Sequence, residues 1–406
     1  MKKIITSIVC LCGAFALPAQ DSVWDREQLS GDWGGKRSAW AAAGYEFSLS
    51  YDVEVFRNAS GGTSKGTVID GLGYGALDID LEKAAGWSSA DFRISTLWTH
   101  GASATGKHVG DELTVSNMDA YDGLRLHEVW VDKSFGNHSI RFGNLLADEE
   151  FAVTEFGGVF INAAFGQPAF WAANTLNTGP AFNVAALGVR YRIDFSETCY
   201  AQAGIYDGDS FDSADGDATI NQHGLHFELG NGQGWTSLYE IGYNGFAVDD
   251  GTGLPSAYRL GAWHHSTSFS KHDSTNGEGN WGLYGATDKL LWREEGDQGL
   301  GSFLRFGTGQ RDRSRFHWVF DTGLSYTGLL PGRDEDVAGL GFVYAKHSGA
   351  ITDAVKSHEA VIEATYRIQL APAVYLQPDI QWINRPSGDT TTSDALVFGL
   401  RAGFTF

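Results

Sequence analysis

The chain has 406 residues and a formal net charge of −21, which argues against nucleic acid and anionic lipid surfaces as partners. Its 53 glycines and 53 aromatic residues (13 Trp, 15 Tyr and 25 Phe), with only 8 prolines and 2 methionines, favour many strands joined by turns over bundles of helices. Beyond Leu17, no apolar run approaches the roughly 20 residues that a membrane-spanning helix needs.

The N-terminus carries an export signal. Lys2 and Lys3 precede an apolar run over residues 4–17, and small residues follow at a plausible cleavage site. We therefore expect residues 1–19 to be a signal peptide. The mature chain then keeps only Cys199, so neither an internal disulfide nor a cysteine metal site is expected.

A short helix is predicted next, over Lys36 to Ala43, with Gly44 ending it. From Tyr45 to Phe56, apolar and polar residues then alternate almost without error. A period of two places the apolar row on one face of a strand and the polar row on the other. The same pattern recurs to the C-terminus without a linker or a helical stretch, which favours one closed sheet over several domains.

The final stretch, Ala395 to Phe406, fits two kinds of β structure. Phe398, Leu400 and Phe404 alternate with small residues and Arg401. In a soluble sandwich the apolar row faces a core, whereas in a membrane barrel it faces lipid and the polar row faces a wet lumen. Phe406, Phe404 and Leu400 are also the predicted membrane insertion signal.

The connections between the predicted strands differ in length. Phe135–Asn137 and Leu370–Ala373 read as tight turns, whereas Asn58–Gly71, Gly101–Asp122 and Ala147–Pro180 read as long loops. Short turns at one rim and long loops at the other are typical of outer-membrane barrels. The pattern gives about seventeen candidate strands, but bacterial single-chain barrels close with an even number. The assignment is weakest over residues 224–292.

Several stretches resemble the carbohydrate-selective porins of the OprB family. They include LSGDWGGKR, HEVWVDKSFGNHSIRFGNLLADEEF and LAPAVYLQPDIQWINRPSG, which are Leu29–Arg37, His127–Phe151 and Leu370–Gly388. The resemblance implies an all-β fold, a single transmembrane antiparallel β-barrel of about 16 strands over residues 45–406. It also implies a periplasmic segment over residues 20–44 that carries the short helix.

The same resemblance implies a function and a location. The protein would be a porin in the outer membrane of a Gram-negative bacterium, passing small neutral mono- and oligosaccharides by passive diffusion through a polar lumen narrowed by an inward-folded loop. Its partners would be these sugars, outer-membrane lipids and lipopolysaccharide, and the outer-membrane assembly machinery. The oligomeric state, monomer or trimer, stays open. No catalytic residue, cofactor or metal is expected.

Residues 147–180 form the candidate constriction loop, because they combine hydrogen-bonding side chains with aromatic faces that suit sugars. The alternative is an external loop that stabilises the rim. On the strands, inward arginines and carboxylates offer donors and acceptors for hydroxyl groups, although each could equally form a salt bridge of the wall. The predicted lining and substrate-contact residues are Asp148, Glu149, Glu150, Glu155, Asn162, Phe165, Trp171, Arg190, Arg192, Arg305, Glu363, Arg367, Asp379 and Arg401.

Two further patterns carry little weight. His264 and His265 are adjacent on a strand, so they point to opposite faces and cannot chelate one metal together. The acidic loop over residues 207–217 resembles a calcium loop only superficially, because Phe211 stands at a ligand position. Whether this loop binds a cation stays open.

Other functions compete with the porin. One is a secreted, soluble all-β glycan-binding protein or glycoside hydrolase, whose acid pair would come from residues such as Glu149 and Glu240. Another keeps the barrel but makes it an adhesin or a channel for other solutes.

Overall fold

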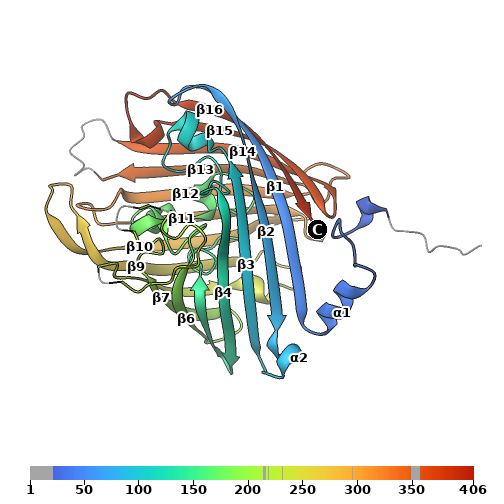
Figure 1. Cartoon of the computed structure of the whole chain (residues 1–406). Helices are drawn as coiled ribbons and strands as arrows, with labels where there is room; N and C mark the ends of the chain where they lie inside the picture. The colour runs from blue at the N-terminus through green and yellow to red at the C-terminus, as the bar shows by residue number, and fades with distance from the viewer. Residues whose placement is uncertain (1–21, 214–215, 218, 231, 295, 349–356) are drawn as a thin grey trace, which may run out of the picture.

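The computed structural model describes residues 22–213, 216–217, 219–230, 232–294, 296–348 and 357–406. These residues form one closed barrel of 16 antiparallel strands, in which each strand pairs with its chain neighbours and β1 pairs with β16 (Figure 1). The predicted single all-β barrel is therefore confirmed. The predicted signal peptide, residues 1–19, lies outside the described residues.

The strands run as follows: β1 Tyr45–Ser60, β2 Gly66–Asp80, β3 Ala90–Gly101, β4 Gly123–Phe135, β5 His138–Leu145, β6 Ala186–Asp194, β7 Cys199–Asp207, β8 Trp235–Asn244, β9 Ser256–Ser270, β10 Asn276–Arg293, β11 Gly299–Thr308, β12 Phe316–Thr327, β13 Val337–His347, β14 His358–Ala371, β15 Val374–Asn384 and β16 Ala395–Thr405. The α-helices are short: α1 Lys36–Ala42, α2 Leu81–Ala85, α3 Ala163–Gly166 and α4 Ala169–Ala172. No helix in the described ranges is long and apolar enough to cross a membrane.

The alternation of the sequence becomes the two faces of the barrel wall. On β16, Phe398 and Leu400 are exposed on the outside, while the side chain of Arg401 is buried inside. On β1, Leu49 is exposed and Glu54 is fully buried. Large apolar side chains cover the outer face of the other strands as well, so the outside presents the oily band and the inside the polar row.

The N-terminal arm, residues 22–44, is fastened to both ends of the barrel sequence. Helix α1 ends at Ala42, and Gly44 follows the capping residue Ala43 with a φ of +90°, which suits glycine. The backbone N–H of Leu29 donates to the carbonyl oxygen of Thr405 at 2.8 Å, and Arg37 Nη2 donates to the Phe406 oxygen at 2.7 Å. Helices α1 and α2 lie at the same rim of the barrel (Figure 1).

Two predictions about the strands are wrong. The expected long connection over residues 58–71 is only the turn 61–65, because β1 and β2 continue past it and Asn58 pairs with Gly66. The β-branched residues Thr67, Val68 and Ile69 favour this extension over a glycine-rich loop. The weakly assigned region holds three strands, β8 to β10, which gives 16 strands rather than seventeen.

The long connections lie at one rim of the barrel and join strands between β3 and β8. They join β3 to β4 (residues 102–122), β5 to β6 (146–185) and β7 to β8 (208–234). The connections at the opposite rim include the two-residue turns 136–137 and 372–373. Two of the long segments pack against the inner face of the barrel and build the site described next.

Candidate functional site

The connection over residues 146–185, here named the inner loop, is hydrogen-bonded to strands far from its own ends. It leaves β5 and returns to β6, yet Glu363 on β14 accepts hydrogen bonds from the backbone N–H groups of Ile161 (2.6 Å) and Asn162 (2.9 Å). The Asn162 amide also donates to Gln381 Oε1 on β15 at 3.1 Å. The middle of the inner loop is therefore attached to the wall formed by β14 and β15.

Two more carboxylates of the wall hold the loop backbone in the same way. Glu240 on β8 accepts from the N–H of Ala152 at 2.8 Å, and Asp288 on β10 accepts from the N–H of Glu155 at 2.8 Å. Arg259 pairs with the other oxygen of Asp288 at 2.8 Å. A hydrogen bond from a buried amide to a charged acceptor is among the stronger ones in proteins, so these acids act as anchors for the loop.

Arg305 on β11 supplies the complementary anchor for loop carbonyl groups. Its guanidinium donates to the carbonyl oxygens of Ala164 (2.8 Å) and Phe165 (2.7 Å) and pairs with Asp321 on β12 at 2.9 Å. Arg305 and Asp321 are each only 1% exposed. The planar fork of arginine suits this task, because it directs several donors at once toward fixed acceptors.

Aromatic side chains fill the space between the inner loop and this wall. Phe165 packs on Phe160 with ring centroids 4.4 Å apart, and its edge meets Phe303 of β11 at 6.0 Å. Trp171 is fully buried, and Phe170 stacks on Tyr284 of β10 at 5.5 Å. We name the inner faces of β8 to β15 the packed wall, because the inner loop covers their polar rows.

The opposite side of the interior, named here the open wall, is formed by the inner faces of β1 to β6, and two sizeable cavities lie on this side. The larger has a volume of about 690 Å³ and lies between the 102–122 connection and the inner loop, where Asp148 and Glu149 line it. The smaller, about 490 Å³, opens at the rim that carries α1. Its charged and aromatic lining comprises Glu46, Asp78, Asp80, Lys83, Asp91, Phe92, Trp130, Asp132 and Arg141.

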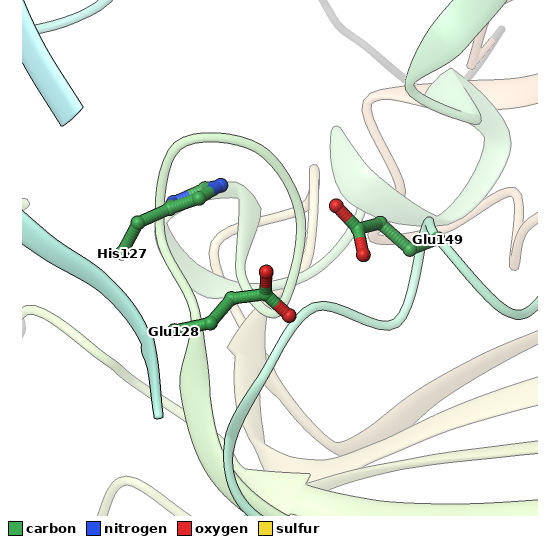
Figure 2. A group of neighbouring side chains, drawn as sticks. All are labelled: His127, Glu128 and Glu149. Carbon is green, nitrogen blue, oxygen red and sulfur yellow. The ribbon is translucent and has the colours of Figure 1, made fainter. Parts of the chain in front are cut away.

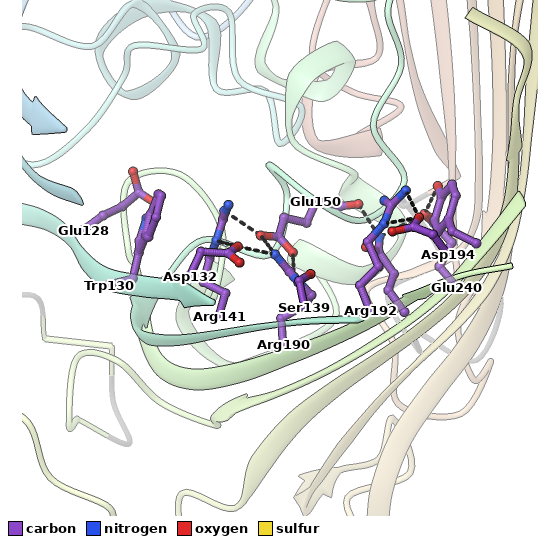
Figure 3. A network of polar contacts seen from close by, with 12 residues as sticks. Glu128, Trp130, Asp132, Ser139, Arg141, Glu150, Arg190, Arg192, Asp194 and Glu240 are labelled. Carbon is purple, nitrogen blue, oxygen red and sulfur yellow. Dashed lines mark hydrogen bonds and ion pairs between the residues drawn. The ribbon is translucent and has the colours of Figure 1, made fainter. Parts of the chain in front are cut away.

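A ladder of ion pairs follows the open wall from the smaller cavity (Figure 3). Arg141 on β5 pairs with Asp132 (2.8 Å) and Glu150 (2.6 Å), and Arg190 on β6 pairs with the same two carboxylates at 2.7 and 2.5 Å. The Arg141 guanidinium also lies 4.0 Å from the centre of the Trp130 ring. Alternating charges along a wall give fixed donors and acceptors for polar solutes.

Two other predicted arginines are held by partners of the wall. Arg401 on β16 pairs with Glu54 of β1 at 2.5 Å and donates to Asn117 of the 102–122 connection at 2.6 Å. Arg367 stacks on Tyr375, with its guanidinium carbon 4.0 Å from the ring centre.

The predicted site residues thus fall into two groups. Those buried against the packed wall are Asn162, Phe165, Trp171, Arg305, Glu363 and Asp379; those along the open side are Asp148, Glu149, Glu150, Arg190 and Arg192. The Glu155 side chain is exposed although its backbone is anchored. Burial raises the pKa of the Asp148 carboxyl to about 7, against the opposing hydrogen bond from the Phe182 N–H.

Sequence reasoning missed several residues that complete these networks. Asp132 and Arg141 are direct cross-strand partners on the two sides of the tight turn at residues 136–137. Counting outward from that predicted turn would have paired them, because residues at equal distances from a hairpin turn face each other. Trp130, two positions before Asp132, follows on the same inward row.

The sequence model of the family described as "Carbohydrate-selective porin, OprB family" matches residues 75–406. The chain is 24% identical over 423 residues to a putative porin QuiX of Acinetobacter baylyi, covering 94% of each chain. It is 23% identical over 441 residues to Porin B of Pseudomonas aeruginosa, covering 93% of this chain and 91% of the relative. The high-pH structure of Pseudomonas putida OprB superposes with a TM-score of 0.83 at 20% identity, covering 94% of this chain and 99% of that one.

Proposed function

The chain belongs to the carbohydrate-selective porins of the OprB family, and from this premise we propose that small sugars diffuse along the open wall, between the inner loop and β1 to β6. The protein is an outer-membrane sugar porin of a Gram-negative bacterium and not an enzyme. The soluble glycan-binding protein or hydrolase considered from the sequence is therefore excluded. We propose the route that the sugar takes through the barrel, the segment that narrows the pore and the size of sugar that passes.

One observation carries the proposal, the contrast between the two sides of the interior. On the packed side, wall carboxylates and Arg305 are occupied by backbone groups of the inner loop, and phenylalanines fill the remaining space. On the open side, one cavity opens at the rim that carries α1 and another lies between the 102–122 connection and the inner loop. We therefore place the path of the solute along this side, with its narrowest point beside the ladder of Arg141, Asp132, Glu150 and Arg190.

The chemistry of the open side suits a sugar in transit. A carbohydrate gives up part of its water shell when it enters a narrow pore, and charged side chains that are fixed by one another can replace those hydrogen bonds. The arginines donate and the carboxylates accept, so both roles of a hydroxyl group are met. Because each charge of the ladder already has a partner, contacts of the ladder with the solute stay weak enough for release.

We also assign roles within the predicted residues. Asp148, Glu149, Glu150, Arg190 and Arg192 contact the solute or the water around it. Asn162, Phe165, Trp171, Arg305 and Glu363 hold the inner loop in place and set the pore size indirectly. A pore confined to one side of the lumen accepts mono- and small oligosaccharides and rejects longer chains.

The test is liposome swelling with neutral sugars of graded size, together with single-channel conductance. In one variant, residues 153–171 are replaced by a short Gly-Ser link; in the control, the β9–β10 turn at residues 271–275 is replaced by Gly and Ser. We expect the first variant to conduct more and to lose discrimination against larger sugars, and the control to match the natural protein. Equal conductance and equal size discrimination in both variants would rule out the inner loop as the constriction.

A further inference from the structure

Strand β4 contains an irregularity that turns two consecutive side chains to the same face. Ser95 of β3 pairs with Glu128, and the next residue, Thr96, pairs with Leu126, so His127 is the extra residue of a β-bulge. His127 and Glu128 are only 4% and 2% exposed. In a regular strand, one of two adjacent residues would face the lipid, whereas a bulge re-aims a side chain and is often found next to a functional site.

The inner loop brings a third side chain to this point. Glu149 lies where the loop leaves β5, and its carboxylate is near the side chains of His127 and Glu128 (Figure 2). One nitrogen of His127 and one carboxylate oxygen from each of Glu128 and Glu149 all lie within 4.8 Å of one another. Two separate elements, the bulged strand β4 and the inner loop, thus converge on one small volume.

The imidazole of His127 is fixed in place but lacks a polar partner. Its ring meets the rings of Tyr74 and Phe182 edge-on, with centroids 6.5 and 5.9 Å away. Nδ1 is buried and accepts or donates no hydrogen bond among the described residues. A buried polar atom without a hydrogen bond costs folding free energy, so a ligand that contacts this atom would be bound favourably.

The two carboxylates also retain free acceptor capacity. Glu128 Oε1 accepts from the indole N–H of Trp130 at 2.9 Å, while its Oε2 has only a long contact of 3.5 Å with the Ser95 hydroxyl. The described part of the chain offers no hydrogen bond or ion pair to the carboxylate of Glu149, which is exposed to the larger cavity. Each acid therefore has an oxygen available for a further ligand.

Nearby arginines do not neutralise this cluster directly. Arg93 pairs with Asp78 at 2.6 Å, and Arg141 pairs with Asp132 and Glu150. Neither arginine forms an ion pair with Glu128 or Glu149 among the described residues, so a bound cation would be the direct partner of these two carboxylates.

We propose that His127, Glu128 and Glu149 form a binding site for a divalent transition-metal ion, for which Zn²⁺ is the best match. An imidazole nitrogen with two carboxylate oxygens is a ligand set that Zn²⁺ accepts, at about 2.0–2.2 Å from each ligand. Because the side chain of Glu149 can rotate, its carboxylate can move toward His127 and Glu128 until all three ligands contact the ion. The remaining coordination position faces the larger cavity and takes water or a solute oxygen.

This site goes beyond the transport of sugars and differs from the expectation that the protein binds no metal. A regular strand would place His127 and Glu128 on opposite faces, and the bulge at His127 brings both to the inner face. A bound cation would lie beside the diffusion path and add positive charge to it. We therefore expect Zn²⁺ to lower the conductance for cations while it is bound.

The experiment uses the full mature protein without a histidine tag, purified in detergent, and titrates it with ZnCl₂ in a calorimeter. We compare the natural protein with His127→Ala and Glu149→Gln, and use His138→Ala, at the β4–β5 turn, as the matched control. Glu149 is exposed in the loop, so Glu149→Gln tests the site even where a change at the buried His127 impairs folding.

We expect one Zn²⁺ per chain in the natural protein and in His138→Ala. Loss of a mere supporting partner of a metal ligand typically costs about 10–100-fold in affinity, so each site variant should bind at least about tenfold more weakly. The same variants should lose the effect of Zn²⁺ on single-channel current. Absence of stoichiometric binding to the natural protein, or undiminished binding in either site variant, overturns the proposal whatever the sugar measurements show.

Discussion

The packed wall and the open wall are made from the same kind of strand, yet they use their inward polar residues differently. On the packed wall, Glu363, Glu240 and Asp288 accept hydrogen bonds from backbone N–H groups of the inner loop. On the open wall, Asp132 of β4 pairs with Arg141 and Arg190 of β5 and β6, and the inner loop meets the same two arginines through the side chain of Glu150. The comparison shows that the alternation of apolar and polar residues places charged side chains in the interior of the barrel. Whether such a side chain holds the inner loop or lines the pore depends on whether the loop covers it.

The largest effect is expected when Arg305, the cationic anchor of the packed wall, is replaced. Arg305→Ala leaves Asp321 buried without its partner and frees the carbonyl groups of Ala164 and Phe165. Loss of one member of a buried ion pair typically costs about 3–5 kcal/mol. We expect a lower unfolding temperature in detergent and a larger, noisier single-channel current.

The matched control for this variant is Arg367→Ala. Arg367 lies half-buried on β14 and stacks on Tyr375, and it has no hydrogen bond or ion pair with the inner loop among the described residues. This control should keep the conductance of the natural protein. An Arg305→Ala protein with unchanged current and stability would show that the packed wall does not depend on this anchor.

A second, smaller effect concerns the place where the 102–122 connection meets the packed wall. Asp111 is buried beside Glu112 and Glu359. Burial raises the pKa of the Asp111 carboxyl to about 7; the side chain of Thr105 opposes the rise, and the nearby charges of Asp119 and Glu112 add to it.

A raised folded-state pKa means that the folded protein holds this proton more tightly than the unfolded chain does. The stabilisation is complete below the ordinary value of 3.8, and it is lost as the pH rises through about 7. Asp111→Asn is always neutral, so its melting temperature should exceed that of the natural protein at pH 8 and approach it near pH 4. Asp250→Asn, in an exposed turn, is the control; parallel pH profiles for Asp111→Asn and the natural protein would contradict the assignment.

The smallest effect is expected on the open wall. Glu46 is an exposed acid in the smaller cavity, where it adds to the negative potential of the mouth. Glu46→Gln should lower the preference for cations over anions by less than about twofold, and the change should shrink as salt rises, because exposed charges are screened. Reversal potentials in a salt gradient measure this ratio. Glu197→Gln, in the β6–β7 turn at the same rim but outside the lining, should leave the ratio unchanged.

The sequence predicts the wall of this molecule better than its interior. The period of two places Arg190, Arg305, Glu363 and Arg401 on inward rows without any knowledge of the fold, because one face of each strand must meet lipid. The start of β2 contains glycines and is predicted as part of a loop, because glycine is less frequent in strands than elsewhere. The pairing with β1 outweighs that preference here.

What could not be predicted depends on contacts between distant parts of the chain. Nothing in the local pattern around Ile161 indicates that its N–H would meet Glu363, some 200 residues later. Likewise, the bulge at His127 depends on how β3 and β4 pair, and a single strand carries no sign of it. The aromatic and acidic composition of residues 147–180 did indicate a special role, but not which of these residues are buried.

The attachment of the N-terminal arm has a consequence for biogenesis. Leu29 and Arg37 bind the backbone of Thr405 and Phe406, and the N–H of Phe406 in turn donates to the carbonyl oxygen of Leu49 at 2.8 Å. Because the arm is continuous with β1, these contacts tie the start of the first strand to the end of the last one. We therefore expect the arm to dock when β1 and β16 pair, and protease resistance of residues 22–44 on a gel would follow that step.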